Sequence, residues 1–204
     1  DTAVLSHGHY DHSGGLAAFR QLNKTAPVYV LKSAFGDYFH GERYIGIDKK
    51  IAQFPGIEIV EGNREIDGEL SLFTGITGRR HWPQSNLLLS EMAEGKLRQD
   101  AFHHEQCLVI RGEKTLLLSG CAHNGILNIL DKYQELYDGL PDMMKKTDYT
   151  EQEREAIRQT AEELAASNLL FYTGHCTGQA AVDIMKPILG DRLIPIHCGM
   201  EILI

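Results

Sequence analysis

Apolar and polar positions alternate along this chain in short blocks that predict an α/β protein. Apolar runs of six to eight residues, many rich in Val, Ile, Phe or Tyr, predict strands that are buried inside a layered fold. These runs are found at 2–7, 26–33, 57–62, 70–75, 105–112, 114–120, 169–174 and 193–199. The two runs at 105–112 and 114–120 meet at Gly112 and Glu113, which predicts a β-hairpin.

Between these runs, apolar residues recur at helical spacing. This spacing predicts helices at 14–24, 124–137, 150–167 and 179–189. The apolar stripes of the first three are Leu16, Phe19 and Leu22; Ile126, Leu127, Ile129, Leu130 and Leu136; and Ile157, Ala161 and Leu164. Thr150 and Glu153 have the spacing of a capping box, so we expect the third helix to begin there. Strands that alternate with helices predict a layered α/β fold.

Composition narrows the class of protein without naming a function. The chain has 204 residues, of which 43% are hydrophobic and 24% charged, as in folded soluble proteins. Its net charge is −8 and its basic residues are scattered, so we expect no nucleic-acid partner. No apolar run approaches the roughly 20 residues of a membrane span. The four cysteines lack C-x-x-C spacing, which favours a reduced, cytoplasmic protein over a disulfide framework.

The segment LSHGHYDHSGG, residues 5–15, places four side chains that bind metals within a few positions. On an extended backbone His7 and His9 point the same way, and Asp11 and His12 follow where the chain turns. Imidazole and carboxylate groups suit zinc, manganese or iron, and two pairs of ligands favour two adjacent metals over one. A chance histidine-rich loop would lack the apolar strand before the motif and the aspartate inside it.

The order of His7, His9, Asp11 and His12 resembles the signature of the metallo-β-lactamase superfamily. Five further segments resemble one branch of this superfamily, which is named after dihydropterin ribofuranosyl-aminobenzene-phosphate synthase. These segments are residues 39–47, 73–83, 103–110, 116–130 and 172–178. The resemblance implies an αββα sandwich. It also implies that the first two histidines serve one metal and that the Asp-His pair serves the second.

The resemblance extends the ligand set to the ends of later strands. Cys121 stands where most of the superfamily has the aspartate that bridges the metals, and His123 follows two residues later. A thiolate is a good zinc ligand, and the alternative for Cys121 is a small buried core residue. His175 follows a strand in the segment YTGHCTG and is expected to be the last histidine of the site. The predicted metal ligands are therefore His7, His9, Asp11, His12, Cys121, His123 and His175.

Three more residues are candidates for contacts with a small-molecule substrate. His104 lies near the place where the superfamily supplies a third histidine to the first metal. Arg79 and Arg80 lie in segments typical of the branch, and an arginine can bind a phosphate or carboxylate through two hydrogen bonds. The alternative for each arginine is a solvated loop charge.

The resemblance also shows where this chain differs from the family. Superfamily members normally carry several strands before the histidine-rich motif, so residues 1–204 are expected to be one metallo-β-lactamase-like domain without its N-terminal strands. Branch members usually carry a strand ending in Gly-Phe-His where this chain passes from Asp142 to Met143, so a segment is expected to be missing there. An uncovered sheet edge would leave a homo-oligomer as an alternative to a monomer.

Two divalent metals about 3.5–4 Å apart can hold a hydroxide and polarise a phosphoryl or carbonyl oxygen. We therefore predict a metal-dependent hydrolase that uses a metal-bound hydroxide on a small, phosphate-containing substrate, with Asp11 as the catalytic residue. Zn²⁺ is the expected ion, with Mn²⁺ or Fe²⁺ as alternatives. The other hypotheses are a non-catalytic metal-binding or sensor domain and, from the branch name, a synthase acting on a phosphoribosyl-aromatic compound. A two-iron oxidoreductase is disfavoured, because such sites have glutamate where His9 stands.

Overall fold

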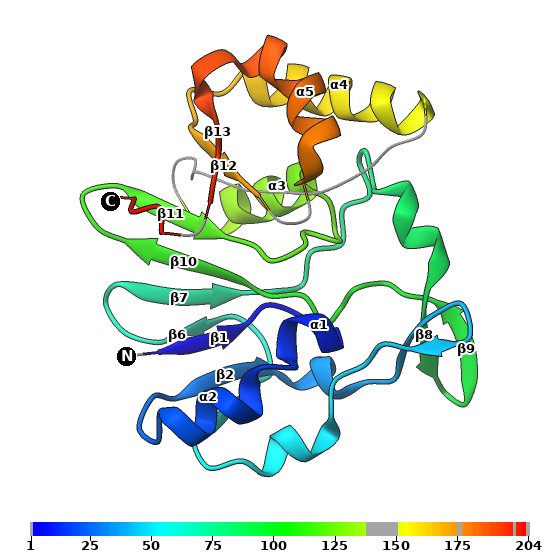
Figure 1. The fold of residues 1–204 in the computed structure, drawn as a ribbon, viewed down its shortest axis with the longest axis vertical. Helices are drawn as coiled ribbons and strands as arrows, with labels where there is room; N and C mark the ends of the chain where they lie inside the picture. Colours follow the sequence, from blue (N-terminus) through cyan, green and yellow to red (C-terminus); the bar gives the residue numbers. More distant parts are fainter. Residues whose placement is uncertain (1, 138–150, 175–176, 198, 203–204) are drawn as a thin grey trace.

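The computed structural model describes residues 2–137, 151–174, 177–197 and 199–202. Figure 1 shows helices on two opposite sides of the molecule and strands between them. Buried apolar residues form a cluster between each pair of neighbouring layers. One lies between the outer helices and the first sheet, one between the two sheets, and one between the second sheet and the helix on its other face. The αββα layering expected from the sequence is confirmed.

The first sheet is antiparallel and has the strand order β11-β10-β7-β6. Its strands are β6 (Arg64–Glu65), β7 (Leu70–Phe73), β10 (Cys107–Arg111) and β11 (Thr115–Leu118). Alternate residues of a strand point to opposite faces. Phe73 and Val109 accordingly pack under the outer helices, whereas Leu72 and Leu108 face the second sheet. The predicted hairpin is confirmed by the antiparallel pairing of β10 with β11.

Three helices and a pair of parallel strands cover the outer face of the first sheet. They are α3 (Ile126–Leu136), α4 (Glu151–Ala165), α5 (Gly178–Leu189), β12 (Phe171–Thr173) and β13 (Leu193–Pro195). Ile157, Ala161 and Leu164 are buried, as their spacing predicts. Leu136, the last residue of α3, is 37% exposed, so it does not belong to the buried stripe predicted for this helix. The predicted cap at Thr150 lies outside the described residues.

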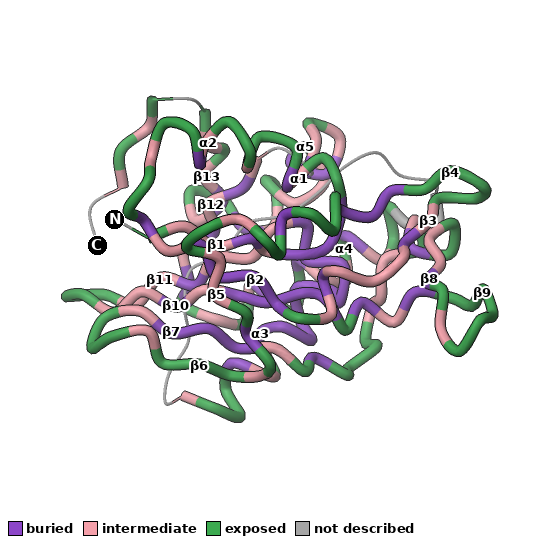
Figure 2. Tube along the Cα trace, turned by 90° about the horizontal axis from the view of Figure 1, so that it is seen from below, coloured by how far each residue is buried: buried purple, intermediate pink, exposed green. Residues whose placement is uncertain are grey.

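The second sheet is parallel, and its strands are β1 (Ala3–Leu5), β2 (Val28–Leu31) and β5 (Ile57–Val60) in the order β1-β2-β5. Every residue of β2 is buried, because this strand is covered on both faces. Val28 and Val30 pack on the side of α2 (Leu16–Leu22), and Tyr29 and Leu31 pack toward the first sheet. Figure 2 shows the buried segments running through the middle of the molecule, along β2 and β7.

The helix α2 departs from its predicted stripe at one position. Leu22 was expected to face the core, but its side chain is 90% exposed. At 3.6 residues per turn, Leu22 lies about 120° around the helix from Leu16, whereas Arg20 lies about 40° away. Arg20 therefore shares the buried face, and its guanidinium donates to the carbonyl oxygens of Ala26 and Lys24.

A third, antiparallel sheet lies at one side of the sandwich, at the right in Figure 1. Its order is β4-β3-β8-β9, from β3 (Tyr38–His40), β4 (Arg43–Tyr44), β8 (Leu89–Ala93) and β9 (Lys96–Gln99). The remaining short elements are α1 (Tyr10–Ser13) and 3₁₀ turns at Lys32–Phe35, Lys49–Gln53, Gln84–Leu88 and Gly190–Arg192.

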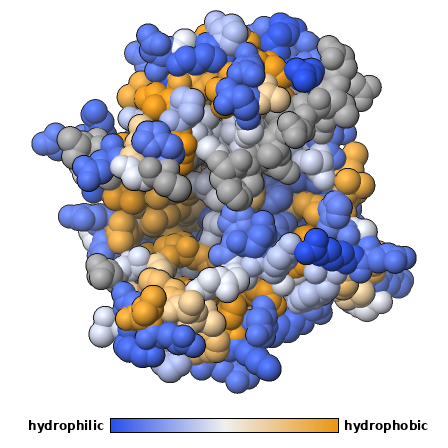
Figure 3. Space-filling model, viewed as in Figure 1, coloured by the Kyte–Doolittle hydropathy of each residue, from blue (hydrophilic) through white to orange (hydrophobic). Residues whose placement is uncertain are grey.

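The outer rim of the molecule is largely hydrophilic, including the end formed by α4 and α5 (Figure 3). None of the helices in the described ranges combines the length and apolar character that a membrane span requires.

Candidate metal centre

The histidine-rich segment lies at the carboxyl end of β1. Pairing with β2 ends at Leu5, so the strand is shorter than predicted and His7 lies beyond it. His9 forms an isolated bridge with Gly46, and α1 begins at the next residue. Gly8 packs so closely that a Cβ there would lie 2.7 Å from the carbonyl oxygen of Ala34. The glycine between the two histidines is therefore required by packing.

Three histidines meet behind this loop. His7, His9 and His123 are buried, and one possible ligand atom from each lies within 4.8 Å of the others. Their ring centroids are 4.7–5.0 Å apart. The Nε2 atoms of His7 and His9 are buried and have no hydrogen-bond partner among the residues that the structure describes. Such atoms are costly in a protein interior, and a metal ion would satisfy both.

The second ring nitrogen of two of these histidines is held by a neighbour. His7 Nδ1 lies 3.0 Å from the hydroxyl of Ser6. Asn86 donates from Nδ2 to the His123 carbonyl oxygen and places Oδ1 3.0 Å from His123 Nδ1. Because Oδ1 can only accept, His123 Nδ1 carries the proton, and Nε2 is the nitrogen that a metal would bind.

A second group adjoins the first through His7. His7, His12 and Cys121 offer ligand atoms that also lie within 4.8 Å of one another. Cys121 Sγ lies 3.1 Å from His12 Nε2, and the rings of His7 and His12 are 4.2 Å apart. Cys121 and His123 lie in the turn after β11, where Ala122 has a φ of 48°. The structure thus brings together five of the seven sequence-predicted ligands.

Of the two other predicted ligands, Asp11 lies beside the second group and His175 is not among the described residues. Asp11 is about half exposed, and its Oδ2 lies 3.8 Å from His12 Nε2, at the edge of the second group. His175 lies outside the described residues, as does the junction of Asp142 and Met143 where a missing segment was expected.

Burial and crowding keep the imidazoles of His7 and His9 neutral. Burial lowers the pKa of His7 well below its ordinary value, and repulsion from protonated His123 and His9 lowers it further. Burial, followed by repulsion from His104, lowers the pKa of His9 to about 3. At neutral pH both rings therefore keep the lone pairs that metal binding requires.

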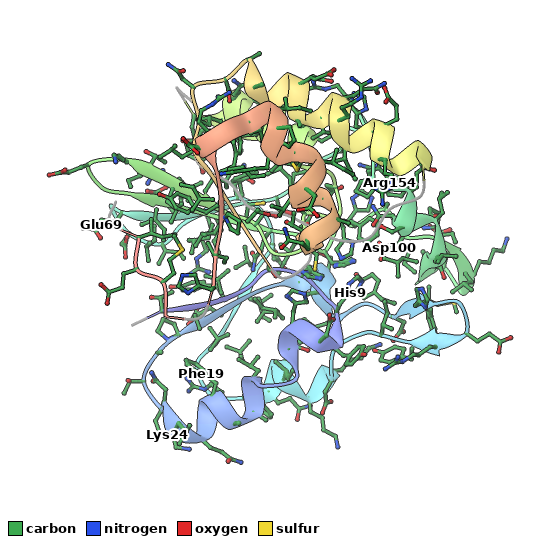
Figure 4. All side chains as sticks on the ribbon, turned by 45° about the horizontal axis from the view of Figure 1, so that its top comes forward. His9, Phe19, Lys24, Glu69, Asp100 and Arg154 are labelled. Carbon is green, nitrogen blue, oxygen red and sulfur yellow. The ribbon has the colours of Figure 1, made fainter. Side chains whose placement is uncertain are left out.

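His104 lies behind His9 and is fully buried. The Gly8 N–H donates to His104 Nδ1 at 2.9 Å, and His104 Nε2 lies 3.0 Å from Asp100 Oδ2. Figure 4 shows His9 and Asp100 close together, at the end of the central strands opposite Glu69. This geometry fits a positioning role better than the substrate contact predicted for His104. Asp100 was missed, because an aspartate after β9 carries no signal in the sequence.

The two predicted substrate arginines have partners within the protein. Arg79 donates to the carbonyl oxygens of Gly78 and Ala101 and to Asn124 Oδ1, and it stacks on Trp82. Arg80 bonds both carboxylate oxygens of Asp131, at 2.8 and 2.9 Å, and also bonds Glu163. Arg80 therefore ties its loop to α3 and α4. Arg79 borders the metal centre through Asn124, the neighbour of His123.

Comparisons with known proteins identify a family and several similar chains. Residues 1–84 match the family model described as the metallo-beta-lactamase superfamily. The chain is 32% identical over 141 residues to the uncharacterized protein MJ0448 of Methanocaldococcus jannaschii, a match covering 67% of this chain and 53% of that protein. The chain thus spans about half the length of that relative.

Two further relatives cover nearly the whole chain. One is 7,8-dihydropterin-6-methyl-4-(beta-D-ribofuranosyl)-aminobenzene-5'-phosphate synthase of the same organism, 24% identical over 98% of this chain and 74% of its own length. The other is the crystal structure of Tm1679, a metal-dependent hydrolase of the beta-lactamase superfamily. It is 28% identical with a TM-score of 0.78, over 98% of this chain and 78% of that one. With its layered fold and histidine cluster, this chain belongs to the metallo-beta-lactamase superfamily.

Proposed function

We propose that the protein is a metal-dependent hydrolase that acts on a small, phosphate-containing molecule. The observation that carries this proposal is the pair of buried Nε2 atoms of His7 and His9, which have no hydrogen-bond partner in the described part of the chain and lie in one group with His123. Each such atom costs about 1–3 kcal/mol if it stays unsatisfied. A single divalent ion would satisfy both, so the cost of this arrangement is explained by metal binding.

The donor set also supports a second ion and the choice of zinc. His7, His9 and His123 would hold one ion, and His12 with Cys121 would hold another beside it. A thiolate and imidazoles favour zinc over manganese or magnesium, which prefer oxygen ligands. Two bound zinc ions would supply water of lowered pKa and would polarise a phosphoryl oxygen.

Two exposed or half-exposed residues beside the histidines are candidates to accept a proton and to bind the substrate. Asp11 is half exposed beside His12, where its carboxylate can ligate the second ion or accept a proton from water. Arg43 is exposed and stacks on Tyr10, whose hydroxyl accepts a hydrogen bond from it at 2.8 Å. Tyr10 is the neighbour of Asp11 in the sequence, which supports Arg43 as a candidate to bind a phosphate group of the substrate.

One alternative has an observation of its own in its favour. The relation to the dihydropterin-ribofuranosyl-aminobenzene-phosphate synthase extends over 98% of this chain. A synthase acting on a phosphoribosyl-aromatic compound would use the same metals, because they would polarise the same phosphoryl or carbonyl oxygen. Product analysis distinguishes the two: a synthase joins two substrates, whereas a hydrolase consumes water and one substrate.

The experiment measures metal content and turnover in the same samples. Purified protein is loaded with Zn²⁺, its metal is counted by mass spectrometry, and it is assayed against phosphomonoesters, phosphodiesters and lactones. His9→Ala is expected to lose bound zinc and turnover together. His40→Ala is the control, because this exposed histidine belongs to none of the groups described. Zinc-loaded protein that is inactive on the whole panel would contradict the enzyme and support a non-catalytic metal-binding domain.

A further inference from the structure

Three consecutive polar residues lie in the core just before β10. His104, Glu105 and Gln106 are each at most 1% exposed. A buried polar side chain destabilises a protein unless it is hydrogen-bonded, and a buried carboxylate does so most strongly. The partners of these three side chains therefore show what the segment does.

His104 holds the first ligand loop. The backbone N–H of Gly8, which lies between His7 and His9, can only donate, so His104 Nδ1 accepts and carries no proton. Nε2 then carries the proton and donates to Asp100, whose other oxygen accepts the Phe102 N–H at 2.7 Å. His9, Asp100 and His104 also offer possible ligand atoms within 4.8 Å of one another. Because both nitrogens of His104 are already engaged by Gly8 and Asp100, this ring fits a positioning role better than metal binding.

Glu105 holds the second ligand loop. Its carboxylate accepts the backbone N–H of His123 at 2.8 Å, the backbone N–H of Asn124 at 2.9 Å and the Asn124 side chain at 2.8 Å. Two successive N–H groups that point at one carboxylate form an anion-binding nest. The nest lies directly before α3, whose N-terminal dipole also favours a negative charge.

Gln106 connects the segment to the parallel sheet. Its side-chain amide donates to the carbonyl oxygens of Leu5 and Tyr29 at 2.8 and 3.2 Å. Its backbone N–H donates to the carbonyl oxygen of Ser6 at 2.8 Å. Residues 104–106 thus contact the end of β1, the loop of His7 and His9, and the loop of His123. These contacts join the two sheets at the metal centre.

We propose that residues 104–106 are a positioning clamp that fixes the two ligand loops relative to each other before any metal binds, and that Glu105 is its principal residue. The clamp rests on the metal site of the proposed function, but not on hydrolysis. Outer partners of metal ligands typically change metal affinity about 10- to 100-fold when they are replaced. Glu105 holds His123 through the backbone N–H. Replacing Glu105 should therefore loosen the position of His123 but leave its imidazole available to bind metal.

The first test compares two buried carboxylates. Glu105→Gln keeps the shape of the side chain but turns an amide N–H toward a backbone N–H donor. Zn²⁺ titration against a chelating dye is expected to give about 10- to 100-fold weaker binding than in the wild type. Glu91→Gln is the matched control, because Glu91 is buried and its carboxylate bonds Arg98 rather than the backbone of a ligand loop. Equal zinc affinity of Glu105→Gln and the wild type would overturn the proposal, as would equal losses in both variants.

The second test uses the wild type, so it does not depend on whether a variant folds. Amide hydrogen exchange is measured in the metal-free protein and after Zn²⁺ is added. A clamp that is formed in advance predicts slow exchange at His123 and Asn124 in both states, whereas exchange that is fast until zinc binds would overturn it. If the clamp passes both tests but the zinc-loaded protein hydrolyses nothing, the proposed function is contradicted and the clamp is not.

Discussion

Asn86→Ala tests the tautomer assigned to His123. The change removes two hydrogen bonds to His123, from Asn86 Nδ2 to the carbonyl oxygen and from His123 Nδ1 to Asn86 Oδ1. At about 1 kcal/mol net for each bond, the free energy of unfolding should fall by about 2 kcal/mol. Zinc affinity should fall by about 10- to 100-fold, because His123 Nδ1 then loses the acceptor that fixes its proton on that nitrogen.

The assay pairs urea unfolding of the metal-free protein with zinc titration against a chelating dye. Asn128→Ala is the control, because Asn128 is equally buried and bonds the backbone of Arg80 and Asn124 rather than a ligand histidine. Asn128→Ala should lose similar stability and keep its zinc affinity. If Asn86→Ala binds zinc as the wild type does, the assignment of Nε2 as the metal-binding nitrogen is refuted.

Three other changes probe different parts of the site. Metal-free protein should lose stability as pH falls from about 6.5 toward 3, because His7 and His9 take up protons in the unfolded chain but not when they are buried in the folded one. The free energy of unfolding should fall by about 1.4 kcal/mol per pH unit for each histidine, as measured from urea midpoints. Cys121→Ser should lower the zinc count from two to one, and two retained ions would exclude the thiolate as a required ligand. Gly8→Ala should cost about 1–3 kcal/mol in thermal or urea unfolding, because its Cβ would overlap the Ala34 carbonyl oxygen; unchanged stability would contradict that packing.

The strands and the layer order could be predicted because apolar periodicity records burial on one face or on both. The run at β2 has no polar alternation, and it proved to be covered by a sheet and a helix. The stripe predicted for α2 is wrong at Leu22, because Arg20 occupies the buried face and its guanidinium bonds carbonyl oxygens there. A pattern of residue types does not reveal a charged side chain that lies inward and bonds carbonyl groups.

The site was predictable where its residues are close in sequence. His7, His9 and His12 converge as their spacing indicates, and Cys121 and His123 join them from the turn after β11. Their supporting residues could not be predicted. Asn86, Asp100 and Glu105 lie in segments that become neighbours of the ligands only when the sheets pack together. Arg79 and Arg80 bond neighbouring groups of the protein, and their predicted contact with substrate stays a prediction.

The most direct test of the account is a crystal structure of zinc-loaded protein with anomalous diffraction measured on both sides of the zinc absorption edge. The account predicts one zinc peak among His7, His9 and His123 and a second beside His12 and Cys121. No anomalous peak at the histidines, in protein shown to be folded and exposed to excess zinc, would contradict the metal centre on which the proposed function depends.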